Sequence, residues 1–152
     1  MKSLVVYYSE SDNTGKLARA IASRLGVEER RIDTVKPEET ASYDLIFIGT
    51  PVHGYRPNET VTRFIAAMPQ LPGKKVAVFC TMHLFGHNRV IETMRRQLEA
   101  KELIFQGGFC RMGLSRLVAN FGPRIFNRGK PSFKDLDEAA EFARRIHDSL
   151  TK

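Results

Sequence analysis

The sequence predicts an α/β fold: a doubly wound, five-stranded parallel sheet with helices on both faces. Short apolar runs alternate along the chain with stretches whose apolar residues recur at helical spacing. The apolar runs are continuous rather than alternating, which is typical of strands that are buried on both faces of a parallel sheet. Strands that alternate with helices are joined by right-handed crossovers, so we expect one sheet with helices on each side.

Each element is predicted by a local pattern. The expected strands cover residues 3–8, 31–35, 43–49, 75–81 and 103–110. The second of these is the weakest, and the others are rich in β-branched and aromatic residues. The expected helices cover residues 14–25, a segment after Asn58, residues 87–101 and a segment after Ser132. Asn58 is a favourable N-cap, and Ser132 with Asp135 three residues later forms a capping-box pattern.

Length and composition predict a single domain over residues 1–152. The chain of 152 residues is long enough for one substantial core and too short for two. No apolar run approaches the roughly 20 residues that a membrane span needs, so we expect no membrane insertion. The N-terminal residues lack the pattern of a secretory signal, which predicts a cytoplasmic protein.

The basic charge suggests anionic partners. The formal net charge is +7, yet no basic stripe is interleaved with aromatic residues, so nucleic acid is not expected as a partner. The segment from Leu103 to Lys134 contains no acidic residue. Its basic residues are a possible docking surface for a redox partner protein or an anionic small-molecule substrate: Arg111, Arg116, Arg124, Arg128 and Lys130. A merely solvated basic loop is the alternative.

The cysteines and histidines indicate no metal centre. Cys80 and Cys110 are far apart in sequence and match no CxxC motif or zinc spacing. We expect both to be small hydrophobic residues at strand ends, with a redox-active thiol as the alternative. Three histidines fall in loops, His53, His83 and His87, but no nearby acidic residue completes a set of metal ligands.

The loop after the first strand predicts an anion site. Residues 9–14, SESDNT, leave a buried strand and enter a helix N-terminus. Hydroxyl groups, the Asn13 amide and free backbone N–H groups can converge there on one phosphate, assisted by the helix dipole. The alternative is a polar turn that only caps the helix.

This loop resembles the phosphate loop of the flavodoxin family. The segment YYSESDNTGKLA matches at Ser9, Ser11, Asn13 and Thr14, and the resemblance implies that these residues bind the phosphate of FMN. Asp12 stands where the family usually has glycine. An aspartate tolerates the left-handed backbone conformation, and Lys16 in the first helical turn is expected to offset its charge.

Two further loops extend the resemblance. The segment GTPVHGY is similar to the second cofactor loop of the family and contributes Thr50, Pro51, Val52, His53, Gly54 and Tyr55. The family places an aromatic side chain of this loop against the flavin ring, a role open to Tyr55 or His53. The third loop would flank the flavin with Thr81, Met82, His83, Phe85 and Gly86. The resemblance also implies a flavodoxin-like strand order of 2-1-3-4-5.

The function implied by this resemblance is that of an FMN-binding redox protein, an electron-transfer flavodoxin in the first instance. An FMN-dependent oxidoreductase acting on a quinone or a porphyrin-like molecule is one alternative, and a flavodoxin-like interaction module without cofactor is another. No residue is assigned as a catalytic acid, base or nucleophile. A phosphorylated receiver domain is disfavoured because Thr50 stands where an acidic phosphoacceptor is required.

Overall fold

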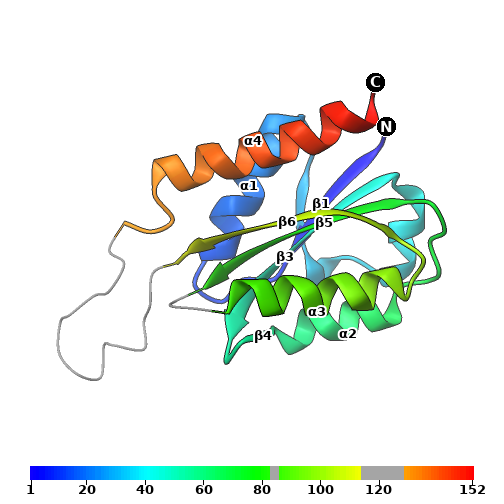
Figure 1. Cartoon of the computed structure of the whole chain (residues 1–152), viewed down its shortest axis with the longest axis horizontal. Coiled ribbons are helices and arrows are strands. Elements are labelled where there is room, and N and C mark those ends of the chain that lie inside the picture. Colours follow the sequence, from blue (N-terminus) through cyan, green and yellow to red (C-terminus); the bar gives the residue numbers. More distant parts are fainter. Residues whose placement is uncertain (83–85, 114–128) are drawn as a thin grey trace.

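The computed structural model describes residues 1–82, 86–113 and 129–152 (Figure 1). Within these residues, five parallel strands form the sheet in the order β2-β1-β3-β5-β6. The strands are β1 (Ser3–Tyr7), β2 (Glu29–Arg31), β3 (Leu45–His53), β5 (Lys75–Met82) and β6 (Ile104–Met112). The predicted α/β class and the predicted strand order are therefore confirmed.

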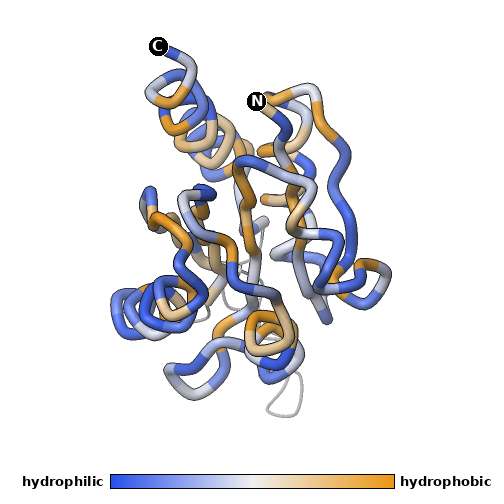
Figure 2. The backbone as a smooth tube through the Cα atoms, turned by 90° about the vertical axis from the view of Figure 1, so that its right-hand side faces the viewer, coloured by the Kyte–Doolittle hydropathy of each residue, from blue (hydrophilic) through white to orange (hydrophobic). Residues whose placement is uncertain are grey.

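Two pairs of helices cover the two faces of the sheet (Figure 1). The helices are α1 (Asn13–Leu25), α2 (Glu59–Ala67), α3 (His87–Glu99) and α4 (Phe133–Leu150). α1 and α4 pack on one face through residues such as Ile21 and Ala143, while α2 and α3 pack on the other through residues such as Ile65 and Met94. Figure 2 shows hydrophobic residues along the central strands, as expected for strands covered on both faces.

The second strand is shorter than predicted and begins earlier. β2 ends at Arg31, and two 3₁₀ segments follow it, η1 (Ile32–Thr34) and η2 (Pro37–Ser42). The Thr34 hydroxyl donates a hydrogen bond of 2.7 Å to the Arg31 carbonyl, a local bond that competes with strand pairing. Ile32 is still buried, so the apolar pattern reports packing of a turn rather than a strand.

The third strand is longer than predicted because it continues into a hairpin. β3 extends to His53 and pairs in antiparallel fashion with the short β4 (Arg56–Pro57), which the sequence analysis did not predict. The two residues of the turn, Gly54 and Tyr55, both have positive φ angles of 54° and 63°. Two-residue hairpin turns favour this conformation because its twist matches that of the strands.

Candidate functional site

Three loops that carry predicted site residues lie at one edge of the sheet. The register pairs Tyr7 of β1 with Gly49 of β3, and Gly49 with Phe79 of β5. The carboxyl ends of these three neighbouring strands therefore lie together. Parallel α/β sheets bind ligands at this edge.

The first loop leads from β1 into α1, and the first residues of that helix are buried. Ser9, Asn13 and Thr14 are buried, with 7%, 3% and 0% of their surface exposed, and Ser11 is half-buried. Asp12 precedes the helix in a left-handed conformation, with φ of 64°, and its side chain caps none of the helix N–H groups. The first N–H groups of α1 have no acceptor within the helix, which is the arrangement that binds anions.

Ser9 places an unmet hydrogen-bonding group in this loop. Its Oγ atom is buried and has no partner among the residues that the structure describes. A buried hydroxyl left without a partner costs about 1–3 kcal/mol. A phosphate oxygen held at the N-terminus of α1 would satisfy this hydroxyl, so the residues present fit the phosphate group of FMN.

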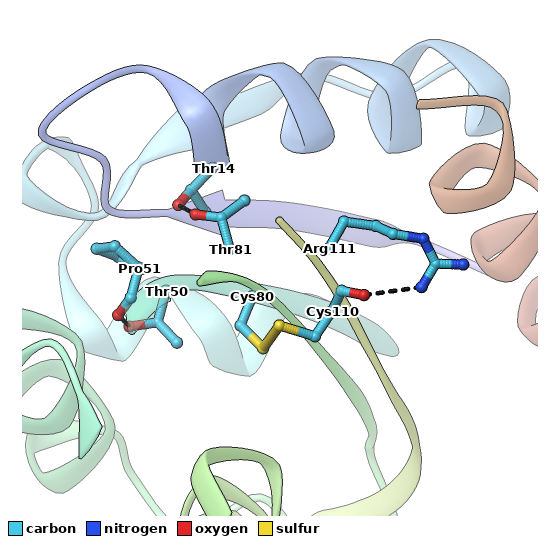
Figure 3. The surroundings of a disulfide bond; sticks show 7 residues. All are labelled: Thr14, Thr50, Pro51, Cys80, Thr81, Cys110 and Arg111. Carbon is cyan, nitrogen blue, oxygen red and sulfur yellow. Dashed lines mark hydrogen bonds between the residues drawn. A yellow bond between two sulfur atoms is a disulfide. The ribbon is translucent and has the colours of Figure 1, made fainter. Parts of the chain in front are cut away.

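Thr14 connects the first loop to the third. Its hydroxyl oxygen lies 2.8 Å from the hydroxyl oxygen of Thr81, at the end of β5 (Figure 3). Both residues are buried, with 0% and 4% of their surface exposed. Thr14 therefore holds the start of α1 against β5, a structural contact that the sequence analysis did not foresee.

Asp12 is neutralised by Arg19 rather than by Lys16. Arg19 binds the Asp12 carboxylate with both terminal nitrogens, at 3.1 and 2.6 Å. These hydrogen bonds raise the pKa of Arg19 above its ordinary value, although partial burial opposes the change. The expectation for Lys16 is corrected, because a guanidinium fork bridges both carboxylate oxygens, as an ammonium group cannot.

The second loop is tied to the first by Glu10. The Glu10 carboxylate lies 3.3 Å from His53 Nε2 and accepts a hydrogen bond of 3.3 Å from Asn58 Nδ2. Thr50 is buried, and its hydroxyl accepts the Asn58 N–H at 2.9 Å and donates to the Pro51 carbonyl at 2.9 Å. These bonds hold the start of α2 beside the first loop.

Val52 and Tyr55 complete the second loop in different environments. Val52 points into the core with 6% of its surface exposed, whereas Tyr55 follows Gly54 at the tip of the hairpin with 52% exposed. The Tyr55 ring contacts the backbone of Gly86, where an added Cβ would lie 2.3 Å from a ring carbon. Of the two candidate aromatic residues, Tyr55 is the one that bridges to the third loop, while His53 pairs with Glu10.

The third loop is only partly within the described residues. Thr81 and Gly86 lie near the first and second loops through the contacts given above. Met82 is half-buried, and its carbonyl accepts the N–H of Gly113 at 2.8 Å. His83 and Phe85 lie outside the described residues, so their predicted roles stay predictions.

The two cysteines form a disulfide, which corrects the expectation of two separate thiols. Cys80 of β5 and Cys110 of β6 are paired in the sheet register, with their Cα atoms 4.6 Å apart (Figure 3). They are buried, with 1% and 8% of their surface exposed, as expected for strand residues. Residues 30 positions apart in sequence become direct neighbours because two parallel strands align them.

Two of the basic residues predicted to form the docking surface are ion-paired with acids of α4. Arg111 donates to Glu138 from two of its nitrogens and lies 3.5 Å from Asp135, and Lys130 bonds to Asp135 at 3.0 Å. Burial disfavours the charge of Asp135, but hydrogen bonds from Ser132 and Lys130 outweigh it and lower the pKa of that carboxyl. Arg116, Arg124 and Arg128 lie outside the described residues, and the docking surface stays a prediction.

The described residues contain neither a metal-binding cluster nor a membrane-spanning helix. No group of three or more His, Cys, Asp or Glu side chains in residues 1–82, 86–113 and 129–152 is arranged to hold a metal ion. In the same part of the chain, no helix has the length and apolar character needed to cross a membrane.

The strand order and the polar loop between β1 and α1 together define a flavodoxin-like α/β protein. The chain belongs to the flavodoxin domain family, whose family model matches residues 4–119. An uncharacterized protein of Methanocaldococcus jannaschii is 29% identical over 150 residues, which cover 96% of this chain and 98% of that protein.

Solved structures share the fold at low sequence identity. Oxidised flavodoxin 1 from Bacillus cereus superposes with a TM-score of 0.78 at 19% identity, covering 97% of this chain and 98% of that one. A flavoprotein from Lactobacillus acidophilus, solved in complex with FMN, has a TM-score of 0.60 at 24% identity, covering 72% of this chain and 92% of that one.

Sequence analysis missed Arg19 and Glu10 as parts of the site. Arg19 follows Asp12 by seven residues, which is close to two helical turns and places both on one side of α1. That spacing was a usable signal. No sequence signal pointed to Glu10, because its partners His53 and Asn58 lie more than 40 residues further along the chain.

Proposed function

We propose that this protein binds FMN with its phosphate in the first loop and carries electrons between redox partners. The observation that carries the proposal is the buried Ser9 hydroxyl, which has no partner among the described residues and lies in the loop that leads into α1. Membership of the flavodoxin domain family and the likeness to a flavoprotein solved with FMN support the choice of cofactor. The cytoplasmic location expected from the sequence belongs to the same proposal.

Each loop has a distinct task in this proposal. Ser9, Ser11 and the N–H groups at the start of α1 hold the phosphate, and Thr14 keeps that helix in place against Thr81. Tyr55 offers an exposed aromatic face for the flavin ring. The bound cofactor supplies the electron chemistry, while the protein sets its orientation and electrostatic surroundings.

A pair of serine variants tests the phosphate assignment. Ser3 is the first residue of β1 and Ser9 follows the strand by two residues, and both have a buried hydroxyl with no partner in the described part of the chain. Ser9→Ala should weaken FMN binding by about tenfold and leave riboflavin binding unchanged, because only FMN carries the phosphate. Ser3→Ala is the matched control at the opposite end of the strand and should change neither affinity.

Fluorescence titration of the flavin-free proteins measures the affinities of the unaltered protein and of both variants for FMN and for riboflavin. Equal losses of FMN and riboflavin in the Ser9→Ala variant would remove the phosphate-loop assignment. An absorption spectrum of the protein produced with ample riboflavin tests the broader proposal, because bound flavin gives visible bands. A colourless protein that also fails to bind added FMN would favour the interaction module without cofactor.

A further inference from the structure

A groove lies beside the candidate site, between the β3–β4 turn, α2 and α3. Its volume is about 450 Å³, which falls in the range of small-molecule pockets, about 300–1,000 Å³. Its lining includes Tyr55, Arg56, Glu59, Thr62, Arg89 and Gln97. None of these residues belongs to the phosphate loop, so the groove is separate from the anion site at α1.

Two arginines in this groove lack a counter-ion. Neither Arg56 nor Arg89 forms a salt bridge or side-chain hydrogen bond with another described residue. The acid in the lining, Glu59, is bonded to Arg63 at 2.5 Å. Glu92, one turn beyond Arg89 on α3, is bonded to arginines of its own helix. The groove therefore carries uncompensated positive charge next to acids that are already paired.

Gln97 places a buried polar atom without a described partner beneath the same groove. Gln97 follows Arg89 by eight residues on α3, so both side chains lie on one side of the helix. Its Oε1 atom is buried and has no hydrogen-bond partner in the described part of the chain. Next to the groove, α3 thus carries an arginine that has no counter-ion among the described residues and a buried amide oxygen that has no donor among them.

We infer that this groove binds a small organic anion bearing carboxylate or phosphate groups. Arg56 and Arg89 would hold the acidic groups. The exposed ring of Tyr55 covers the apolar part of the ligand. The inference does not rest on FMN binding, although Tyr55 places the groove beside the loop proposed to contact the flavin.

The test is a titration of the full chain with citrate and with pyrophosphate, followed by ¹H–¹⁵N NMR of backbone amides and arginine Nε–H groups. We expect saturable shifts at Arg56 and Arg89, which separate the groove from any binding at the phosphate loop. Arg56→Gln and Arg89→Gln should each raise the dissociation constant of the groove by about five- to tenfold. Glu59→Gln removes the acid in the lining and should tighten binding by about twofold.

Arg96→Gln is the matched control, because it removes the same charge from the same helix on an exposed, ion-paired residue. It should change the dissociation constant by less than about twofold. Weakening equal to that of Arg89→Gln would show attraction to net charge only and overturn the inference. Chemical shifts that never saturate would also overturn the inference. So would a protein that binds a glutamate-rich peptide but neither citrate nor pyrophosphate.

Discussion

Replacing Arg19 by glutamine is expected to weaken FMN binding by exposing the phosphate to the charge of Asp12. Consecutive Cα atoms are 3.8 Å apart, so an anion held about two residue spacings from Asp12 would lie roughly 7 Å from its carboxylate. At that distance and an effective dielectric of about 40, each phosphate charge is repelled by about 1 kcal/mol before salt screening. Arg19 cancels most of this repulsion because it binds both carboxylate oxygens, at 3.1 and 2.6 Å.

At low salt, Arg19→Gln should raise the dissociation constant of FMN about fivefold, because screening by salt removes part of the repulsion. Riboflavin lacks the phosphate and should bind equally well before and after the change. Asp12→Gly should tighten FMN, because it removes the acid and glycine accepts the left-handed backbone. The double variant of Asp12→Gly and Arg19→Gln removes both charges and should bind FMN about as well as the unaltered protein.

Flavin fluorescence titrations at about 20 mM and about 500 mM salt measure the effect, which should shrink at the higher salt. Arg24→Gln is the matched control, because Arg24 is an exposed arginine of the same helix with no salt bridge to a described residue. The reasoning fails if Arg19→Gln weakens FMN and riboflavin alike, or if the double variant binds no better than Arg19→Gln alone.

Three further predictions concern stability. Reduction of the Cys80–Cys110 disulfide, which spans 30 residues, should remove about 3–4 kcal/mol and lower the melting temperature by about 10 °C in calorimetry. Asp135→Asn should cost about 1 kcal/mol at neutral pH, measured by urea unfolding. Because the folded protein lowers the pKa of Asp135, this contribution is complete above the ordinary pKa of about 4 and disappears as pH falls through the folded value. Gly49→Ala should cost about 1–3 kcal/mol in the same assay, since the new Cβ would lie 2.3 Å from the Phe79 ring.

Each stability prediction has an outcome that contradicts it. Two titratable thiols in protein purified without reductant, with no change of melting temperature on adding one, would contradict the disulfide. If Asp135→Asn lowers the free energy of unfolding by the same amount at pH 3 and at pH 7, the carboxylate charge of Asp135 is not the source of the stabilisation. A Gly49→Ala variant as stable as the unaltered protein would mean that the Phe79 ring can move aside at no cost.

Local pattern was sufficient to predict most of the fold. The apolar run at β1 predicted a strand covered on both faces, and all five of its residues are buried. The N-cap at Asn58 and the capping box at Ser132 are both observed, because these bonds join residues two or three positions apart. Residues 31–35 were wrongly predicted to form a strand. Ile32 is buried, but it lies in a 3₁₀ turn, where an apolar residue packs as well as it does in a strand.

The sequence by itself determined the four strands β1, β3, β5 and β6, the helices and the polar loop at the start of α1, since each depends on neighbours along the chain. Tertiary structure decided which charges and thiols meet. Strand register brought Cys80 beside Cys110, and the position of α4 placed acids on Arg111. Tertiary structure also left Arg56 and Arg89 without a salt bridge to any described acid, because Glu59 in their groove is bonded to Arg63. Ion pairs and disulfides depend on distances of a few ångströms between segments far apart in sequence, and only the packing of helices on the sheet sets those distances.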